Sequence, residues 1–248
     1  MSFKSSIRAA LPRRSKPRRI LAGPLRGRRL VTSWHDYPGA LLGRTEGPLL
    51  EWFAARVRPG DTWLDVGAHY GYTAMALCDL VGPQGRVFAF EPMLKTAGDL
   101  AETRRVNGLH QLRIVPLALG DRAQGFPVTV SRGMAAIDRG TIATPELVYS
   151  VALDSSWAWL AGYDRRIDGI KIDVQGMEAE ALIGMEGTLT NVRPYLVVEF
   201  HQGVDRAPIL ELLARAGYGL PGNLIDERGV SGPTEYRDDR SYAFDPPR

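Results

Sequence analysis

Acidic and polar side chains follow four short apolar segments of this chain. Asp65 lies in the first segment, Glu91 ends the second, and Asp173 ends a later one. Glu199 and His201 end the last of the four. If these segments are parallel strands, their carboxyl ends meet at one edge of a sheet, where open α/β sheets bind their ligands. The spacing therefore predicts that all five side chains face one crevice.

A glycine turn follows Asp65 and precedes a predicted helix. Gly67 and Gly71 stand four positions apart, with His69 and Tyr70 between them. A dinucleotide fingerprint needs another glycine at the third position, so that a pyrophosphate can approach the backbone. S-adenosylmethionine has no phosphate, and a carboxylate such as Asp65 can hold its amino group directly or through water. The turn therefore favours S-adenosylmethionine over NAD.

Glu91 supplies the second half of a nucleoside site. It lies 20 residues after Gly71 and is followed by Pro92. A carboxylate at this position can accept two hydrogen bonds from a ribose diol. The turn alone, or the carboxylate alone, is also compatible with an ordinary turn or a solvated strand end. Their conjunction at this spacing predicts a cofactor site.

If the cofactor is S-adenosylmethionine and the acceptor is a hydroxyl, a side chain must remove the acceptor proton, and four residues are candidates: His201, Asp173, Glu199 and Glu178. Period-two geometry places Glu199 and His201 on one face of a strand, where the carboxylate would raise the pKa of the imidazole. Asp173 has an alternative as the ion-pair partner of Lys171. Glu178 has one as a charge in the first turn of a helix, and His201 has one as a strand-end hydrogen-bonding group.

A metal is a further alternative at the same place. Asp173, Glu199 and His201 include hard ligands that suit Mg²⁺. Nothing in their spacing demands a cation, so we predict no metal site and keep a Mg²⁺-dependent mechanism as an alternative.

Apolar periodicity alternates between strand and helix along the chain. This predicts an α/β fold with a doubly wound, mostly parallel seven-stranded sheet of Rossmann-like type. We expect strands at 62–66, 86–91, 112–117, 126–130, 148–152, 169–174, 195–201 and near 242–244, and helices at 48–57, 72–81, 94–107, 155–160, 178–189 and 208–215. Residues 33–47 should form a loop or short strands over the cofactor mouth. Residues 132–147 should form a long loop that reaches over the substrate.

Charge divides the 248 residues into two parts. Ten of the 31 lysines and arginines lie in residues 1–29, and no acidic residue occurs before Asp36. We therefore expect residues 1–32 to be a basic, disordered arm and residues 33–248 to be the globular domain. The bases of residues 4–29 could bind nucleic acid, an acidic carrier protein or a phospholipid surface. The arm has no aromatic residue after Phe3, which argues against base stacking.

Composition excludes several other classes. The one cysteine, Cys78, cannot form an internal disulfide framework or a cysteine-based zinc site. No segment is apolar for the length of a membrane span. No apolar segment follows the basic start, so a cytoplasmic location is expected.

From about Glu46 to His201 the chain resembles the FkbM family of S-adenosylmethionine-dependent class I methyltransferases. The segments that carry the resemblance are 64–71 (LDVGAHYG), 88–92 (FAFEP), 118–121 (ALGD), 151–154 (VALD), 170–178 (IKIDVQGME) and 197–201 (VVEFH). The first is shared by most class I methyltransferases, and the segment at 170–178 is the specific one. One departure is Gln175, where such proteins usually have Glu, and this puts any role of that carboxylate in doubt.

The resemblance implies O-methylation of a hydroxyl on a sugar, polyketide or other small molecule. It also implies that Asp65, Gly67 and Gly71 line the methionine end of the cofactor, that Glu91 holds the ribose and that Ala118 lies beside the adenine. The predicted cofactor-binding residues are Asp65, Gly67, Ala68, Gly71, Glu91, Pro92, Ala118 and Asp173. The acceptor and the oligomeric state are not specified by these residues.

The residues leave three alternatives open. The basic arm is compatible with methylation of an RNA ribose or another nucleic-acid group. A non-catalytic domain could keep the same cofactor fold. An NAD oxidoreductase would use the same sheet with a different glycine turn.

Overall fold

Seven strands form the central sheet of the computed structural model, which describes residues 11–131, 134–137, 146–162, 166–225, 236 and 239–246. Their order is β12-β13-β11-β10-β3-β4-β5, with β13 antiparallel to β11, β12 antiparallel to β13, and the other neighbours parallel. These strands are β3 (Thr62–Val66), β4 (Arg86–Phe90), β5 (Leu112–Val115), β10 (Gly169–Ile172), β11 (Tyr195–Phe200), β12 (Asn223–Ile225) and β13 (Arg240–Phe244). The predicted doubly wound, mostly parallel sheet is confirmed.

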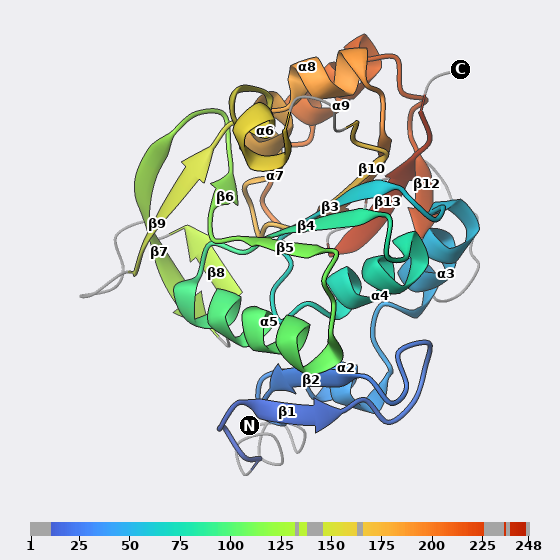
Figure 1. Cartoon of the computed structure of the whole chain (residues 1–248). Helices are drawn as coiled ribbons and strands as arrows, with labels where there is room; N and C mark the ends of the chain where they lie inside the picture. The colour runs from blue at the N-terminus through green and yellow to red at the C-terminus, as the bar shows by residue number, and fades with distance from the viewer. Residues whose placement is uncertain are drawn as a thin grey trace.

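Helices cover both faces of this sheet (Figure 1). One layer contains α3 (Gly47–Arg56), α4 (Tyr72–Val81) and α5 (Leu94–Asn107). The other contains α6 (Leu153–Ala161), α7 (Glu178–Ile183), α8 (Glu186–Asn191) and α9 (Ala207–Arg215). The chain visits β4 and β5 on one side of β3 and then β10 and β11 on the other, so the switch point lies between β3 and β10.

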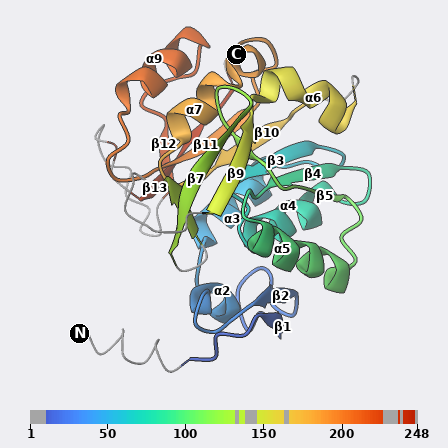
Figure 2. The same cartoon turned by 90° about the vertical axis from the view of Figure 1, so that its left-hand side faces the viewer.

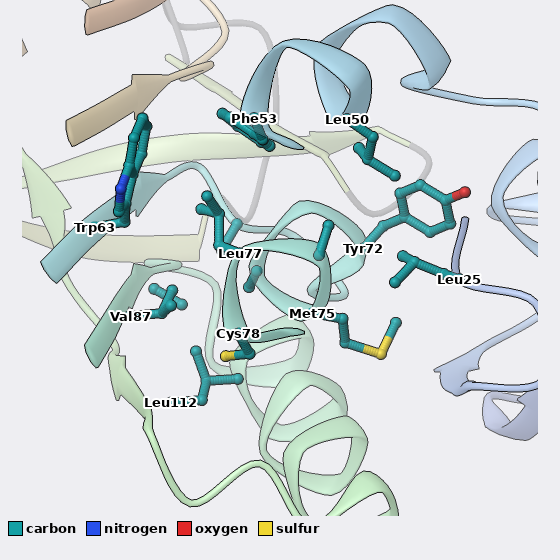
Figure 3. Packing of buried hydrophobic residues seen from close by; sticks show 14 of the residues in the cluster. Leu25, Leu50, Phe53, Trp63, Tyr72, Met75, Leu77, Cys78, Val87 and Leu112 are labelled. Atoms are coloured by element: carbon teal, nitrogen blue, oxygen red, sulfur yellow. The ribbon is translucent and has the colours of Figure 1, made fainter. Parts of the chain in front are cut away.

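Alternating side chains divide the interior into two cores. Trp63 and Val87 face the α4 layer, whereas Leu64 and Phe88 face the α7 layer. Figure 3 shows the first core, in which Trp63, Val87 and Leu112 from the sheet pack against Leu77 of α4. By the same alternation, the Asp65 side chain faces the α4 layer. A carboxylate buried in this way normally has a charged or hydrogen-bonding partner.

A smaller sheet stands beside the main one. Its order is β6-β9-β7-β8, and Figure 2 places β7 and β9 in front of the main strands. The strands are β6 (Ala118–Leu119), β7 (Gln124–Ser131), β8 (Met134–Ile137) and β9 (Glu146–Val151). The strand predicted at 126–130 is confirmed as part of β7, which pairs antiparallel with β8 and β9. The predicted long loop at 132–147 is wrong for 134–137 and 146–147, which are strand residues, while 132–133 and 138–145 lie outside the described residues.

Residues 16–32 form a hairpin instead of a disordered arm. Its strands are β1 (Lys16–Arg19) and β2 (Arg29–Thr32), which pair antiparallel. Ile20, Leu25 and Leu30 are buried in the core on the α4 side, and the Val31 N–H donates to Thr103 Oγ1 of α5 at 3.0 Å. Disorder is therefore the wrong prediction for this segment, because its spaced apolar residues give it a buried face. Residues 1–10 lie outside the described residues.

The hairpin keeps much of its positive charge at the surface. Arg28 pairs with Asp79 of α4. The bases Arg13, Arg14, Lys16, Arg19, Arg26 and Arg29 are exposed. Binding of nucleic acid, an acidic carrier or a phospholipid surface by this part of the chain stays a prediction. Among the described residues, no helix has the length and apolar character of a membrane span.

Two segments differ from the predicted elements: residues 33–47, predicted as a loop or short strands, include a helix, and the single helix predicted at 178–189 is two helices. Residues 33–47 contain α2 (Pro38–Leu42), which begins at a proline and ends at Gly43 in the left-handed conformation. The predicted helix 178–189 is divided into α7 and α8. A Cβ at Gly184 would lie 1.9 Å from the Gly120 carbonyl oxygen, so the chain touches the β6 segment where the helix breaks.

Candidate active site

A cavity of about 450 Å³ opens at the carboxyl ends of β3, β4, β10 and β11. Seven of the predicted site residues line it: Gly67, Ala68, Glu91, Pro92, Ala118, Asp173 and Glu199. The other four, Asp65, Gly71, Glu178 and His201, lie behind this wall. The small sheet closes another side with Phe126, Val128 and Val148. The structure therefore brings most of the predicted residues into one crevice and places the rest directly behind it.

The glycine turn forms the floor of this cavity. The N–H groups of Gly67 and Ala68 both donate to the Phe90 carbonyl oxygen at 3.0 Å, which ties the turn to β4. Gly67 has φ of +79°, and a Cβ there would lie 1.8 Å from the Asp173 carbonyl oxygen. Gly71 caps α4 with φ of +90°. Glycine is therefore required at position 67 both for its backbone conformation and for the close approach of the chain after β10.

We expect Gly67→Ala to lower the free energy of unfolding by about 3–5 kcal/mol, because the new Cβ must displace a backbone carbonyl. Gly60→Ala is the matched control. Gly60 also has positive φ, +94°, but nothing lies within 4 Å of its added Cβ, so only the conformational penalty of about 1–2 kcal/mol remains. Urea unfolding of both variants measures the difference. Equal losses would contradict the close approach.

Glu91 is held at the cavity wall by two backbone donors. Its Oε2 accepts from the His69 N–H at 2.9 Å, and its Oε1 accepts from the Met93 N–H at 3.0 Å. Burial raises the pKa of Glu91 to about 7, although both N–H groups act to lower it. The carboxylate thus holds the glycine turn through the His69 N–H and also lines the cavity.

Lys171 joins the ends of two neighbouring strands. Its Nζ lies 3.3 Å from Asp65 Oδ1, 3.2 Å from Asp173 Oδ2 and 3.4 Å from the Gly67 carbonyl oxygen. Asp65 is fully buried and also accepts a hydrogen bond from Thr73 Oγ1 at 2.7 Å. Burial alone would lower the pKa of Lys171, but the charges of Asp173 and Asp65 outweigh it, so this pKa is raised. Asp65 therefore reaches the cavity through Lys171 and not by direct contact.

His201 lies behind Asp173 and Glu199. Its Nδ1 is 2.6 Å from Glu178 Oε1, and Glu178 is fully buried. Its Nε2 is 3.4 Å from Asp173 Oδ1 and 3.6 Å from Glu199 Oε1. The Gln175 amide nitrogen is 2.6 Å from the same Nε2. This arrangement fits a proton on Nδ1 that is donated to Glu178, with the Nε2 lone pair accepting from Gln175.

The ionisable groups at this end have shifted pKa values. Burial lowers the pKa of His201, but the bond to Glu178 and the neighbouring carboxylates outweigh it, so the pKa is raised. Burial, followed by the charges of Asp173 and Glu46, raises the pKa of Glu199 to about 7. Burial opposes ionisation of Asp173, yet Lys171 and His201 together lower its pKa. Asp173 is therefore more firmly ionised than Glu199.

The cavity residues that were not predicted as site residues include Glu46, Tyr37 and Lys171. Glu46 and Tyr37 enter from the segment before α3, and Lys171 enters from β10. The Tyr37 ring lies 5.3 Å from the His69 ring, which ties this segment to the glycine turn. Glu46 has φ of +56° and precedes the Gly47-Pro48 start of α3. In the sequence, a polar residue directly before this Gly-Pro helix start is the signal that could have identified Glu46 as a site residue.

The methyltransferase FkbM domain matches residues 65–220, well over half of the chain. This chain belongs to the FkbM methyltransferase family. The match begins at Asp65 and includes every strand end that lines the cavity. The predicted family is therefore confirmed, and the cavity lies at the carboxyl ends of strands within the matched segment.

Individual relatives of this FkbM chain agree with that assignment. Hexuronic acid methyltransferase AglP of Haloferax volcanii is 27% identical over 175 residues, covering 70% of each chain. The 2-O-methyltransferase NoeI of Sinorhizobium fredii is 27% identical over 197 residues, covering 68% of this chain and 79% of that one. The FkbM methyltransferase structure from Methylobacillus flagellatus KT superposes with a TM-score of 0.52 at 17% identity, covering 79% of this chain and 50% of that one. This last comparison shows the shared fold, and the chain spans half the length of that structure's chain.

Proposed function

We propose that this protein transfers a methyl group from S-adenosylmethionine to a hydroxyl group of a small molecule, with sugars as the first acceptor class. One observation carries the proposal: a single cavity holds Glu91 at one end and Asp173 with Glu199 at the other. Strands β4 and β11 are three strand spacings apart, about 14 Å, which suits an extended nucleoside with an acceptor beyond it. The name of one relative, a hexuronic acid methyltransferase, supports a carbohydrate acceptor, and the name of the other, a 2-O-methyltransferase, supports transfer to an oxygen.

The cavity fits the cofactor. Its volume of about 450 Å³ lies in the range of small-molecule sites, roughly 300–1,000 Å³. Glu91 would accept the ribose hydroxyls, Pro92 and Ala118 would wall the adenine, and Gly67 and Ala68 would leave room for the methionine end. Asp65 and Gly71 would act from behind, through Lys171 and through the cap of α4. Bound there, S-adenosylmethionine supplies an electrophilic methyl group.

The chain's own residues would prepare the acceptor. Asp173 and Glu199 line the cavity, so either carboxylate can accept the proton of an acceptor hydroxyl. His201 lies behind both and can exchange a proton with them, and Glu178 fixes its orientation through Nδ1. Glu178 is thus a positioning residue in this proposal. Phe126 and Val148 of the small sheet would help exclude water.

Cofactor affinity should fall as the pH drops through 7. The ribose diol needs the ionised carboxylate as acceptor, and the pKa of Glu91 is raised to about 7. Protonation below that pH removes the binding-competent form, so the Kd for S-adenosylhomocysteine should rise about tenfold between pH 8 and pH 6. Calorimetric titration across this range measures it. Glu91→Gln should bind weakly with no such dependence, and an unchanged wild-type Kd would contradict the role of the carboxylate.

Transfer from methyl-labelled S-adenosylmethionine to a panel of acceptors tests the function itself. The panel holds neutral sugars, uronic acids and a structured RNA. We expect label on a sugar hydroxyl, and Glu199→Gln should lower kcat at least 100-fold while cofactor binding is kept. Label on RNA alone would move the acceptor class to nucleic acid. Cofactor binding with no transfer to any acceptor would favour a non-catalytic domain.

A further inference from the structure

Three side chains at the acceptor end of the cavity converge on one point. Asp173, Glu199 and His201 each offer one ligand atom, and these three atoms lie within 4.8 Å of one another. We propose that they form a binding site for one divalent first-row transition cation, of the Mn²⁺ or Zn²⁺ class. The sequence indicated these three residues as ligands only for an alternative, Mg²⁺-dependent mechanism, because their spacing did not demand a cation.

The distances suit a common cation. His201 Nε2 lies 3.4 Å from Asp173 Oδ1 and 3.6 Å from Glu199 Oε1. Ligand atoms about 2.1 Å from one cation stand about 3.0–3.5 Å apart in octahedral or tetrahedral coordination. A small inward movement of two side chains therefore completes the site. One imidazole nitrogen with two carboxylate oxygens favours a transition cation over Mg²⁺ or Ca²⁺, which prefer oxygen ligands.

A second layer of residues orients all three ligands. Glu178 accepts from Nδ1 of His201 at 2.6 Å, which directs the Nε2 lone pair inward. Lys171 Nζ holds Oδ2 of Asp173 at 3.2 Å, and Ser241 Oγ donates to Oε2 of Glu199 at 3.2 Å. Each ligand thus has its outer polar atom occupied, while its inner atom faces the other ligands and, for His201 and Asp173, the Gln175 amide. Metal sites use outer partners of this kind to fix ligand orientation.

Charge also favours a cation here. Five carboxylates surround this end of the cavity: Glu46, Asp65, Asp173, Glu178 and Glu199. Lys171 is the one lysine among the described residues in contact with them. Carboxylates taken out of water need compensating positive charge, and a divalent ion would supply it.

Gln175 gives the site a specific form in this chain. Its amide nitrogen lies 2.6 Å from His201 Nε2 and 3.5 Å from Asp173 Oδ1, so the amide contacts two of the three proposed ligands. The same amide turned over presents its oxygen as a neutral fourth ligand. Because the amide at position 175 is neutral, the ligand set carries the two negative charges of Asp173 and Glu199, which balance one divalent cation.

Mn²⁺ binding to the full-length, metal-stripped protein tests the inference by electron paramagnetic resonance, because bound Mn²⁺ loses the sharp signal of the aqueous ion. We expect one Mn²⁺ per chain. Glu199→Gln and His201→Asn should each weaken binding at least tenfold, and Ser241→Ala about tenfold through the orientation of Glu199. Glu91→Gln is the matched control, because Glu91 lines the same cavity but contacts none of the three ligands.

Two measurements keep folding and function separate from metal binding. Glu199→Gln should still bind S-adenosylhomocysteine, and Glu91→Gln should still bind Mn²⁺, so each variant shows that the other effect is not unfolding. The inference rests on the proposed function only for the location of the acceptor. Absence of stoichiometric Mn²⁺, or wild-type affinity in Glu199→Gln and His201→Asn, overturns the site. Methyl transfer that persists in chelator would then leave the proposed function standing, and Mn²⁺ binding without any transfer would support the site alone.

Discussion

Glu91→Gln is expected to weaken S-adenosylhomocysteine binding about 100-fold or more. Glu91 accepts one backbone N–H with each oxygen, from His69 and from Met93. Glutamine has only one oxygen, so one of these buried donors would face an NH₂ group. The charge that favours the ribose hydroxyls is lost as well. Hydrogen bonds to charged groups contribute about 1.5–3 kcal/mol each, so losing two of them corresponds to a factor of about 100–10,000 in Kd.

Glu199→Gln is the matched control for this effect. It removes the same charge from the same cavity wall, at the end of β11 instead of β4. Calorimetry at pH 8 should give a Kd within about threefold of the wild type for this variant, since Glu199 lies at the acceptor end. If both variants lost cofactor affinity equally, the assignment of the two ends of the cavity would be wrong.

The fold was predictable from sequence because its strands are buried on both faces. Runs such as 62–66 and 195–200 are largely apolar, and the helices between them end at glycines such as Gly108. The hairpin at 16–32 was not predictable in this way. Its buried residues Ile20, Leu25 and Leu30 are too widely spaced for a strand or helix period, and basic residues surround them. Burial there depends on contact with α5, which is distant in sequence.

The candidate site was predictable as a set of strand ends, but not as a network. Parallel strands necessarily bring Glu91, Asp173 and Glu199 to one edge. The sequence could not show that Asp65 faces Lys171 instead of the cavity, or that Glu178 pairs with His201. These pairings depend on the register of β3 against β10 and on the turn that carries Gln175 in a left-handed conformation. Tertiary contacts, and not residue spacing, decide them.

Lys171→Met should be among the most destabilising single substitutions in this chain. Lys171 is almost fully buried and lies between Asp65 and Asp173, of which Asp65 has no exposed surface. Methionine keeps the length of the side chain and removes its charge, so Asp65 is left as a buried, unpaired carboxylate. Removing one partner of a buried ion pair destabilises by about 3–5 kcal/mol. Urea unfolding at pH 7 should show this loss as a lower midpoint with an unchanged slope.

A double-mutant cycle separates the lost ion pair from lost packing. Asp65→Asn in the Lys171→Met background removes the unpaired charge, and the oxygen of the new amide can still accept from Thr73 Oγ1. The double variant should therefore recover about 1–3 kcal/mol relative to Lys171→Met. Additive losses would mean that Lys171 stabilises the sheet through its aliphatic chain and its contact with the Gly67 carbonyl oxygen. Recovery would mean that the charge of Asp65 is what makes a lysine necessary at the point where β3 and β10 meet beneath the glycine turn.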